Sequence, residues 1–179
     1  ARRLGRAGAP ALGVKLAIDT DGEVLTASNH NLDGYWEQPD ATADAQAGGW
    51  FHTGDGGHLD EEGYLVISDR KKDVIISGGE NVSSIEVEDA LMSHAAVKEV
   101  AVIGIPDQKW GELVTALVVT DGSDVSSEDL IAHCRAHLAG YKCPKRVEFV
   151  ETLPRTATGK LQKFKLRETY WQGYERQVN

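Results

Sequence analysis

The stretch DRKKDVIISGGENV, residues 69–82, marks the point where the pattern of the chain changes. After Asp69 it has four successive charged residues, Arg70–Asp73, whose side chains stay in water and bury little. A hinge between two domains needs such a linker, although a plain surface turn has the same composition. The apolar run at 74–76 then predicts a buried strand. We therefore predict one domain over residues 1–69, a hinge at 70–73 and a second domain over 74–179.

Downstream of this stretch the pattern alternates between strands and helices. The loop SGGEN follows the strand, and Ser83–Glu86 form a capping-box signature that opens a helix to about Ser93. The apolar runs VKEVAVIGI and ELVTALVVT and the segment RVEFVE predict further strands. Helices are predicted from about Ser126 to Ala139 and from Gln162 onward. The second domain is therefore predicted to be a compact α+β fold with a small sheet and about three helices.

Upstream of the hinge the chain predicts mostly β structure. Residues 14–27 are typical of two short strands around a turn, and residues 57–70 of a second hairpin that turns at Gly63. Between them, a short helix is predicted to begin near Asp40 and to end at the glycine pair Gly48-Gly49. A small β-rich subdomain thus precedes the second domain, and the fold class of the whole chain is predicted to be α+β.

The charge of the chain is unevenly distributed. Its net charge is −9, yet residues 137–179 hold nine Lys or Arg against four Asp or Glu. This argues against a nucleic-acid partner and for a local anion site near the C-terminus, with a solvated basic helix as the alternative. Lys160 lies in this region, but a phosphate-binding loop of the form G-x-x-x-x-G-K-[ST] would need glycine in place of Pro154 and a hydroxyl residue in place of Leu161. Lys160 therefore does not belong to such a loop.

The composition is that of a globular protein, with 41% apolar and 26% charged residues in 179. Cys134 and Cys143 are too few for a disulfide framework, so we expect a reducing, cytoplasmic location. His133 and His137 are spaced i, i+4 but have no third ligand nearby, so no metal site is predicted. No apolar run approaches the about 18–20 residues of a transmembrane helix. Because the first residue is alanine and the only methionine is Met92, we expect a recombinant, proteolytic or natural piece of a longer protein.

Four segments resemble, in order and spacing, the C-terminal part of the adenylate-forming superfamily: GYWEQPDATADAQAGGWFHTGD, DRKKDVIISGGENV, IPDQKWGE and LPRTATGK. That superfamily groups acyl-CoA synthetases, luciferases and the adenylation domains of peptide synthetases. Its enzymes join a carboxylate to the α-phosphate of ATP and release pyrophosphate. A thiol, often that of CoA, then displaces AMP to form a thioester. The resemblance covers nearly the whole chain, and it implies that residues 1–69 end a large N-terminal domain and that 74–179 form a mobile C-terminal domain.

The resemblance implies roles for four residues in the first half-reaction. Asp55 resembles the carboxylate that accepts hydrogen bonds from both ribose hydroxyls, a task that suits an acceptor-only side chain on a glycine-flanked turn. Arg70 resembles the arginine that approaches the ribose and adenylate, and Lys72 matches the hinge position. Lys160 resembles the mobile-domain lysine that reaches the substrate carboxylate and the α-phosphate, where a cation stabilises the charge that shifts in the transition state. The other basic residues of 153–167 are expected to form a solvated face or to contact the larger domain.

For the second half-reaction the resemblance implies a path for CoA. The SGGEN loop resembles the family loop that enters the site after the hinge turns, and its two glycines leave room for a pantetheine arm. The tryptophan of KWGE resembles the aromatic that lines the CoA entrance, with a strand-edge core aromatic as an equal alternative. The basic residues of YKCPKR are candidates for contacts with the CoA phosphates, unless they are ordinary surface charges. The candidate residues are Gly78, Gly79, Glu80, Trp110, Lys142, Lys145 and Arg146.

The implied parent protein is an acyl-CoA synthetase for a fatty or aryl carboxylic acid, with this chain as roughly its last third. The family's phosphate loop, adenine-contacting segment and acyl pocket all lie upstream, so the missing N-terminal domain is a necessary partner. That domain would hold most of ATP together with its Mg²⁺, and we expect the chain alone to be inactive. One alternative is an adenylation domain that loads a carrier-protein thiol, although GGENV and KWGE favour CoA. The other is a non-catalytic module that uses residues 74–179 to bind a CoA-like ligand or a protein partner.

Overall fold

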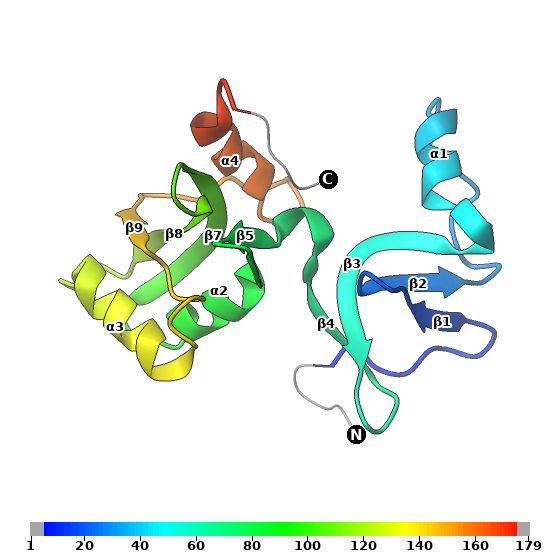
Figure 1. The fold of residues 1–179 in the computed structure, drawn as a ribbon, viewed down its shortest axis with the longest axis horizontal. Coiled ribbons are helices and arrows are strands. Elements are labelled where there is room, and N and C mark those ends of the chain that lie inside the picture. Colours follow the sequence, from blue (N-terminus) through cyan, green and yellow to red (C-terminus); the bar gives the residue numbers. More distant parts are fainter. Residues whose placement is uncertain (1–5, 175–179) are drawn as a thin grey trace. The chain divides into compact units, whose positions relative to one another are not determined.

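The computed structural model describes residues 6–174, which form two compact units (Figure 1). The division falls between Lys71 and Lys72, inside the charged run 70–73. We call the part up to Lys71 unit 1 and the part from Lys72 unit 2, and each is described as a separate body. A turn of 3₁₀ helix, η2 (Lys71–Asp73), contains the point of division.

Unit 1 is built on a four-stranded antiparallel sheet whose strands follow each other in chain order. A short helix and a 3₁₀ turn connect the second strand to the third. The elements are β1 (Lys15–Ile18), β2 (Glu23–Ala27), α1 (Pro39–Ala45), η1 (Ala47–Gly49), β3 (Phe51–Leu59) and β4 (Leu65–Arg70). Both predicted hairpins and the predicted short helix are confirmed. The third strand begins earlier than expected, at Phe51, because Phe51 pairs with Thr26 and so extends the sheet toward the helix.

Glycine at position 57 allows β3 to approach its two neighbours closely. A Cβ atom at Gly57 would lie 2.6 Å from the carbonyl oxygen of Val66 and 3.0 Å from the side chain of Val24. The β3–β4 register also shifts between Gly56 and Gly57, which is the irregularity expected of a bulge. The irregularity in β3 therefore lies at a position with no space for a side chain, two residues after Asp55.

Unit 2 contains a five-stranded mixed sheet and three helices, as the predicted α+β fold class requires. The strand order is β6-β5-β8-β7, with β9 pairing in parallel with β8. The elements are β5 (Ile75–Ser77), β6 (Glu80–Val82), α2 (Ser84–Met92), β7 (Val97–Asp107), β8 (Gly111–Thr120), α3 (Ser127–His137), β9 (Arg146–Phe149) and α4 (Lys163–Trp171). One strand is missing from the sequence prediction: Glu80 and Asn81 were expected to belong to the loop SGGEN, but together with Val82 they form a strand that pairs with β5.

Both faces of this sheet are covered, which explains the continuous apolar runs of β7 and β8. On β7, Val100 and Val102 join the cluster beneath α2 and α3, while Ala101 and Ile103 face the opposite way, toward α4. Figure 1 shows α4 on one side of the strands and α2 and α3 on the other. Unit 2 therefore has two apolar cores separated by one sheet.

Capping residues fix where the helices of unit 2 begin. At the start of α2, the Ser83 hydroxyl accepts the N–H of Glu86 at 3.3 Å, which is one of the two bonds of the predicted capping box. At the start of α3, Ser126 and Asp129 form a reciprocal capping box, with the two backbone N–H groups bonded at 3.1 and 3.2 Å. These caps set the register in which Leu91 and Leu130 face the shared core.

Candidate functional site

Asp55 and Arg70 lie opposite each other on neighbouring strands of unit 1. They are register partners of β3 and β4, and Arg70 Nε is 3.3 Å from Asp55 Oδ1. Both side chains are partly exposed, 34% for Asp55 and 57% for Arg70. Asp55 does not lie on a turn, as the sequence suggested, but within β3, where the preceding Gly54 has a positive φ of 72°. The pair offers carboxylate acceptors beside guanidinium donors, a combination that can bind both hydroxyl and phosphate groups.

Thr53 orients the backbone that carries Asp55. Its hydroxyl donates to the carbonyl oxygen of Val24 at 2.7 Å and accepts the N–H of Asp55 at 3.1 Å. The first bond attaches this segment to β2, and the second sets the direction of the next peptide. The TGD segment is therefore held to the sheet before any ligand is bound.

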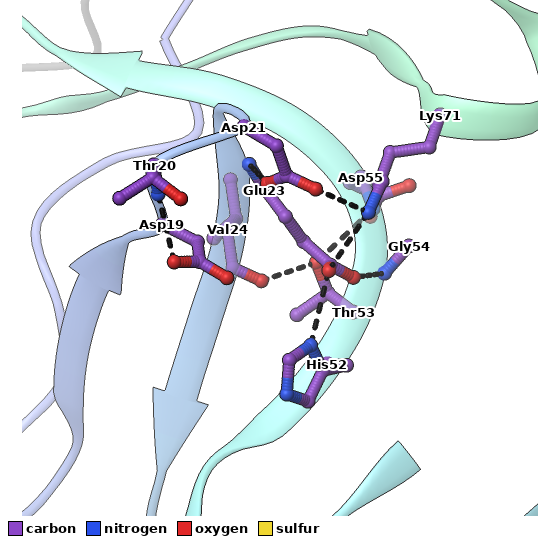
Figure 2. A network of polar contacts seen from close by, with 10 residues as sticks. All are labelled: Asp19, Thr20, Asp21, Glu23, Val24, His52, Thr53, Gly54, Asp55 and Lys71. Atoms are coloured by element: carbon purple, nitrogen blue, oxygen red, sulfur yellow. Dashed lines mark hydrogen bonds and ion pairs between the residues drawn. The ribbon is translucent and has the colours of Figure 1, made fainter. Parts of the chain in front are cut away.

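A buried carboxylate beneath this segment gathers three donors (Figure 2). Glu23 is 5% exposed and accepts from the N–H of Gly54 at 2.8 Å, from His52 Nδ1 at 3.0 Å and from Lys71 Nζ at 3.2 Å. Lys71 also contacts Asp21 Oδ2 at 2.7 Å. Burial raises the pKa of Glu23, but the three hydrogen bonds outweigh it and the net pKa is lowered. The hydrogen bond between His52 and Glu23 also raises the pKa of His52, because the carboxylate stabilises the imidazolium form.

Lys160 lies on a closed loop of unit 2 between β9 and α4. Arg155 and Leu161 form an isolated β-bridge across the base of the loop. Inside it, Thr156 N donates to Lys160 O at 2.8 Å, and the Thr156 hydroxyl accepts the Lys160 N–H at 3.0 Å. Gly159, with a φ of 85°, makes the turn. The Lys160 side chain is exposed on a backbone that is already ordered.

The basic residues around Lys160 correct one sequence expectation. Three of them form ion pairs inside unit 2 instead of a solvated face: Arg155 with Glu99 at 2.7 Å, Lys163 with Glu88 at 2.7 Å and Arg167 with Asp73 at 2.6 Å. Two of these pairs are largely buried, since the Lys163 and Arg167 side chains are 11% and 10% exposed. The positive charge of this segment therefore stabilises the fold at several positions and remains exposed at Lys160 and Lys165.

The predicted CoA path brings together two segments of unit 2. Gly78 and Gly79, with φ of 63° and 84°, form the two-residue turn of the β5–β6 hairpin. The N–H of Gly78 donates to the carbonyl oxygen of Trp110 at 2.7 Å, and a Cβ at Gly78 would lie 2.9 Å from the Trp110 ring. The ring lies 4.5 Å from Lys145 Nζ and 5.1 Å from Lys109 Nζ. Trp110 is thus a half-buried aromatic between β7 and β8, not a core residue.

A cavity of about 470 Å³ lies at this turn. Its walls are partly aromatic, with Trp110 and Trp171 among them, and Gly79 and Ile76 also contribute. Apolar walls with a few polar groups at the edge are typical of sites for small organic ligands. The arrangement suits a narrow chain such as pantetheine, and that role stays a prediction.

The remaining candidates of the path lie in other surroundings. Lys142 Nζ contacts both carboxylate oxygens of Glu86, at 2.7 and 2.6 Å, and this hydrogen bonding raises the pKa of Lys142. Arg146 Nε is paired with Glu148 at 2.7 Å. Glu80 is exposed at the start of β6. A phosphate would have to compete with a protein carboxylate at Lys142 and Arg146.

Three histidines and both cysteines lie in unit 2. His133 Nε2 lies 2.7 Å from the Ser93 hydroxyl, and its ring is perpendicular to that of His94 and tilted against that of His137, with centroids 5.0 and 4.5 Å away. Within residues 6–174, no group of three or more His, Cys, Asp or Glu side chains is placed to hold a metal ion. Both cysteines are buried free thiols. In the same part of the chain, no helix has the length and apolar character needed to cross a membrane.

Comparison with known proteins gives this geometry a family. Residues 86–160 match the AMP-binding enzyme C-terminal domain. The chain is 47% identical to the long-chain-fatty-acid–CoA ligase FadD13 of Mycobacterium tuberculosis over 94% of its own length. It superimposes with a TM-score of 0.86 on o-succinylbenzoate CoA synthetase of Bacillus subtilis in complex with its acyl-adenylate, at 37% identity over 92% of the chain. The TM-score with the amide bond synthetase McbA of Marinactinospora thermotolerans is 0.84, at 41% identity over 93% of the chain.

The chain belongs to the adenylate-forming superfamily. It matches the C-terminal third of the superfamily's acyl-CoA ligases and covers 35% of the Mycobacterium ligase, 36% of the Bacillus synthetase and 37% of the amide bond synthetase. The resemblance inferred from the sequence motifs is therefore confirmed.

Sequence reasoning missed two residues of this adenylate-forming chain that hold neighbours of the candidate residues: Glu23 binds Gly54 and Lys71, and Arg167 binds Asp73. Glu23 and Arg167 are buried charges, 5% and 8% exposed, and neither was selected. For Glu23 the sequence shows only a charged residue at the start of a predicted strand, and its burial becomes visible in the structure alone. For Arg167 the chain gave no local sign, because its partner Asp73 lies 94 residues away.

Proposed function

We propose that the chain supplies the C-terminal third of an ATP-dependent acyl-CoA synthetase that acts on a fatty or aryl carboxylic acid. In the first step a carboxylate oxygen of the acid attacks the α-phosphorus of ATP, and pyrophosphate leaves. In the second step the CoA thiolate attacks the acyl carbonyl carbon, the bond to the phosphate oxygen breaks, and AMP leaves. The kinship with acyl-CoA ligases supports this reaction class, and the relatives include ligases named for fatty acyl and aryl acids.

The observation that carries the proposal is the cross-strand pair of Asp55 and Arg70. A carboxylate and a guanidinium 3.3 Å apart at a partly exposed strand edge can receive a ribose diol and an adjacent phosphate together. Lys160 would supply the third charge, a cation between two anions that must approach each other. Its exposed ammonium on an ordered loop of unit 2 is suited to that task.

For the second step we assign the thiol path to the cavity at the β5–β6 turn. Gly78 and Gly79 keep the turn free of side chains, and Trp110 forms one wall. Lys145, whose Nζ lies over the Trp110 ring, is better placed for a CoA phosphate than Lys142, which is engaged by Glu86. ATP would bring Mg²⁺ with it, held mainly by the N-terminal part of the parent enzyme.

The test uses the longer protein that contains this chain. It is incubated with ATP, Mg²⁺, CoA and a panel of fatty and aryl acids, and AMP and acyl-CoA are quantified together. We expect equimolar AMP and acyl-CoA with at least one acid. Thioester formed only on a phosphopantetheinylated carrier protein would favour the adenylation-domain alternative, and CoA binding without adenylate formation would favour a non-catalytic module.

A second measurement concerns the 179-residue polypeptide itself. We expect no carboxylate-dependent exchange of radiolabelled pyrophosphate into ATP, because Lys160 alone cannot orient a triphosphate. Exchange well above background by the purified polypeptide would contradict the proposal that most of the ATP site lies outside it.

A further inference from the structure

We propose that two ion-pair clamps, one on each side of Lys72, confine bending of the chain to this position, and that Glu23 and Arg167 are the positioning residues of the clamps. The inference rests on the proposed function, because it assumes the hinge at 70–73. It adds a physical reason why bending should be confined to one residue of that hinge. Each clamp lies inside one unit, so its geometry does not depend on how the two units are arranged.

The first clamp holds Lys71 to unit 1 (Figure 2). Lys71 Nζ lies 2.7 Å from Asp21 Oδ2 and 3.2 Å from Glu23 Oε2. The Glu23 side chain is 6% exposed and also accepts the N–H of Gly54 at 2.8 Å. Displacing Lys71 would leave this buried carboxylate with one cation fewer. The carboxylate that holds the last residue of unit 1 therefore also holds the residue before Asp55.

The second clamp holds Asp73 to unit 2. Asp73 Oδ1 lies 2.6 Å from Arg167 Nη1, and the two side chains are 14% and 10% exposed. Arg167 lies on α4, a helix that begins three residues after Lys160. The residue that follows the hinge position is therefore attached to the element that follows the Lys160 loop.

The burial of these charges separates the clamps from ordinary surface ion pairs. An exposed pair contributes little to stability, whereas removing one partner of a buried pair is strongly destabilising because it leaves an uncompensated buried charge. Arg167 and Asp73 are of the second kind, and Lys71, at 38% exposure, lies between the two kinds. Apolar side chains would often stabilise a fold as well as a buried ion pair does. Stability alone therefore does not account for charges at these two positions.

The position of the clamps assigns their role. Lys71 and Asp73 are the immediate neighbours of Lys72, and each is attached to a different unit. A rotation of one unit against the other must then be absorbed by the few backbone dihedrals between the two attachments. A hinge confined in this way favours a small number of orientations over a broad range. An enzyme that must present Lys160 in one step and the Gly78-Gly79 turn in the next needs such a hinge.

The test measures the spread of distances between the units. Spin labels are attached at Glu61→Cys in unit 1 and Glu128→Cys in unit 2, both exposed positions, since the native thiols are buried. Pulsed electron paramagnetic resonance then gives the distance distribution in the longer protein, after any exposed cysteines outside this chain have been replaced by serine. The matched pair of variants is Arg167→Met and Lys163→Met. Both residues lie on α4, and each substitution removes a buried ion pair. Only Arg167 contacts a neighbour of Lys72.

We expect Arg167→Met to widen the distribution by about half or more, and Lys163→Met to leave the width unchanged, because a lost clamp raises the population of other orientations. Asp73→Asn, which is nearly isosteric, decides the question if Arg167→Met does not fold. In unit 1, Glu23→Gln should widen the distribution. Arg6→Met, which breaks the ion pair with Asp60 away from the hinge, should not.

Unchanged widths in both Glu23→Gln and Asp73→Asn would overturn the proposal, and so would equal widening in the control variants. Widening at one clamp alone would overturn the two-clamp arrangement. Thermal unfolding midpoints of all variants are measured in parallel, because a purely structural ion pair lowers the midpoint without changing the width. The distance measurement needs no substrate, so failure of the longer protein to form acyl-CoA would refute the proposed function and leave this result standing.

Discussion

The two units differ in what organises them. Among the described residues, the buried apolar side chains of unit 1 are Val24, Leu25 and Leu65, whereas unit 2 has an apolar cluster on each face of its sheet. Unit 1 instead buries the carboxylates of Glu23 and Asp69. Apolar burial supplies most of the free energy of folding, at about 25 cal/mol per Å². The comparison indicates that unit 2 has two apolar cores of its own, while unit 1 has little apolar stabilisation of its own.

The largest expected effect comes from separating the units. Residues 72–179 expressed alone should fold and unfold in one cooperative thermal transition, because both cores lie inside unit 2. Residues 1–71 expressed alone should show no cooperative transition. Circular dichroism and the dispersion of amide NMR signals measure both outcomes. A well-dispersed spectrum from residues 1–71 would contradict the expected difference in stability between the two units.

The next effect concerns the residue between the units. In the longer protein, Lys72→Pro fixes φ near −65° and restricts Lys71 as well. We expect it to retain the half-reaction that matches the locked orientation, adenylation, and to abolish the other. Lys72→Ala leaves the backbone mobile and should be much milder. Pyrophosphate exchange and thioester formation from supplied acyl-adenylate are measured separately. An equal loss of both steps would indicate misfolding, and near-normal turnover would place the hinge elsewhere.

A third effect tests whether Lys160 acts in the first half-reaction alone. Lys160→Ala in the longer protein should slow adenylate formation by about 10²–10³, the usual cost of removing a group that stabilises transition-state charge. Thioester formation from supplied acyl-adenylate should remain largely intact. Lys165→Ala is the matched control, since Lys165 is an exposed lysine five residues away. If both steps slowed equally, Lys160 would be structural or would serve both of them.

The smallest effect is electrostatic, and it has opposite signs in the two units. Hydrogen bonding to Glu23 raises the pKa of His52 above 6.5. The protonated imidazole therefore stabilises unit 1 below pH 6.5, and this stabilisation is lost as the pH rises through the folded-state pKa. Burial is the main cause that lowers the pKa of His133, and repulsion from His137 adds to it. The neutral imidazole therefore stabilises unit 2 above pH 6.5, and this stabilisation is lost as the pH falls through the folded-state pKa.

Each of these contributions should be about 1 kcal/mol or less at such partly exposed sites. Imidazole titrations followed by NMR give the two pKa values directly, and His52→Asn and His133→Asn assign the signals. If the pKa values of His52 and His133 were both above 6.5 or both below it, the predicted contrast between the units would be wrong.

The fold of unit 2 was largely predictable because its signals are local. The runs 97–107 and 111–120 are long and apolar, and the serine caps announce the starts of α2 and α3. Strand β6 was not predictable in the same way. Its residues Glu80 and Asn81 are exposed and polar, and only pairing with β5 makes them a strand.

The candidate site shows the same limit. Asp55, Arg70 and Lys160 lie in motifs that the sequence displays, and the structure adds that Asp55 and Arg70 are register partners. The carboxylate of Glu23 and the guanidinium of Arg167 could not be recognised in advance. Whether a charged side chain is buried is decided by its partners, and Lys71 lies 48 residues from Glu23. Contacts of that kind come from the tertiary structure and leave no periodic pattern.

The closed loop that carries Lys160 has a consequence for conformational entropy. Ordering one residue's backbone costs about 1–2 kcal/mol. In this loop the β-bridge between Arg155 and Leu161 and the bonds between Thr156 and Lys160 have already ordered the backbone in the folded chain. An open arm would lose that freedom anew at every encounter with a ligand, and the loss would weaken the encounter. The ammonium of Lys160 can therefore engage and withdraw repeatedly while only its own side-chain rotamers are restricted and released.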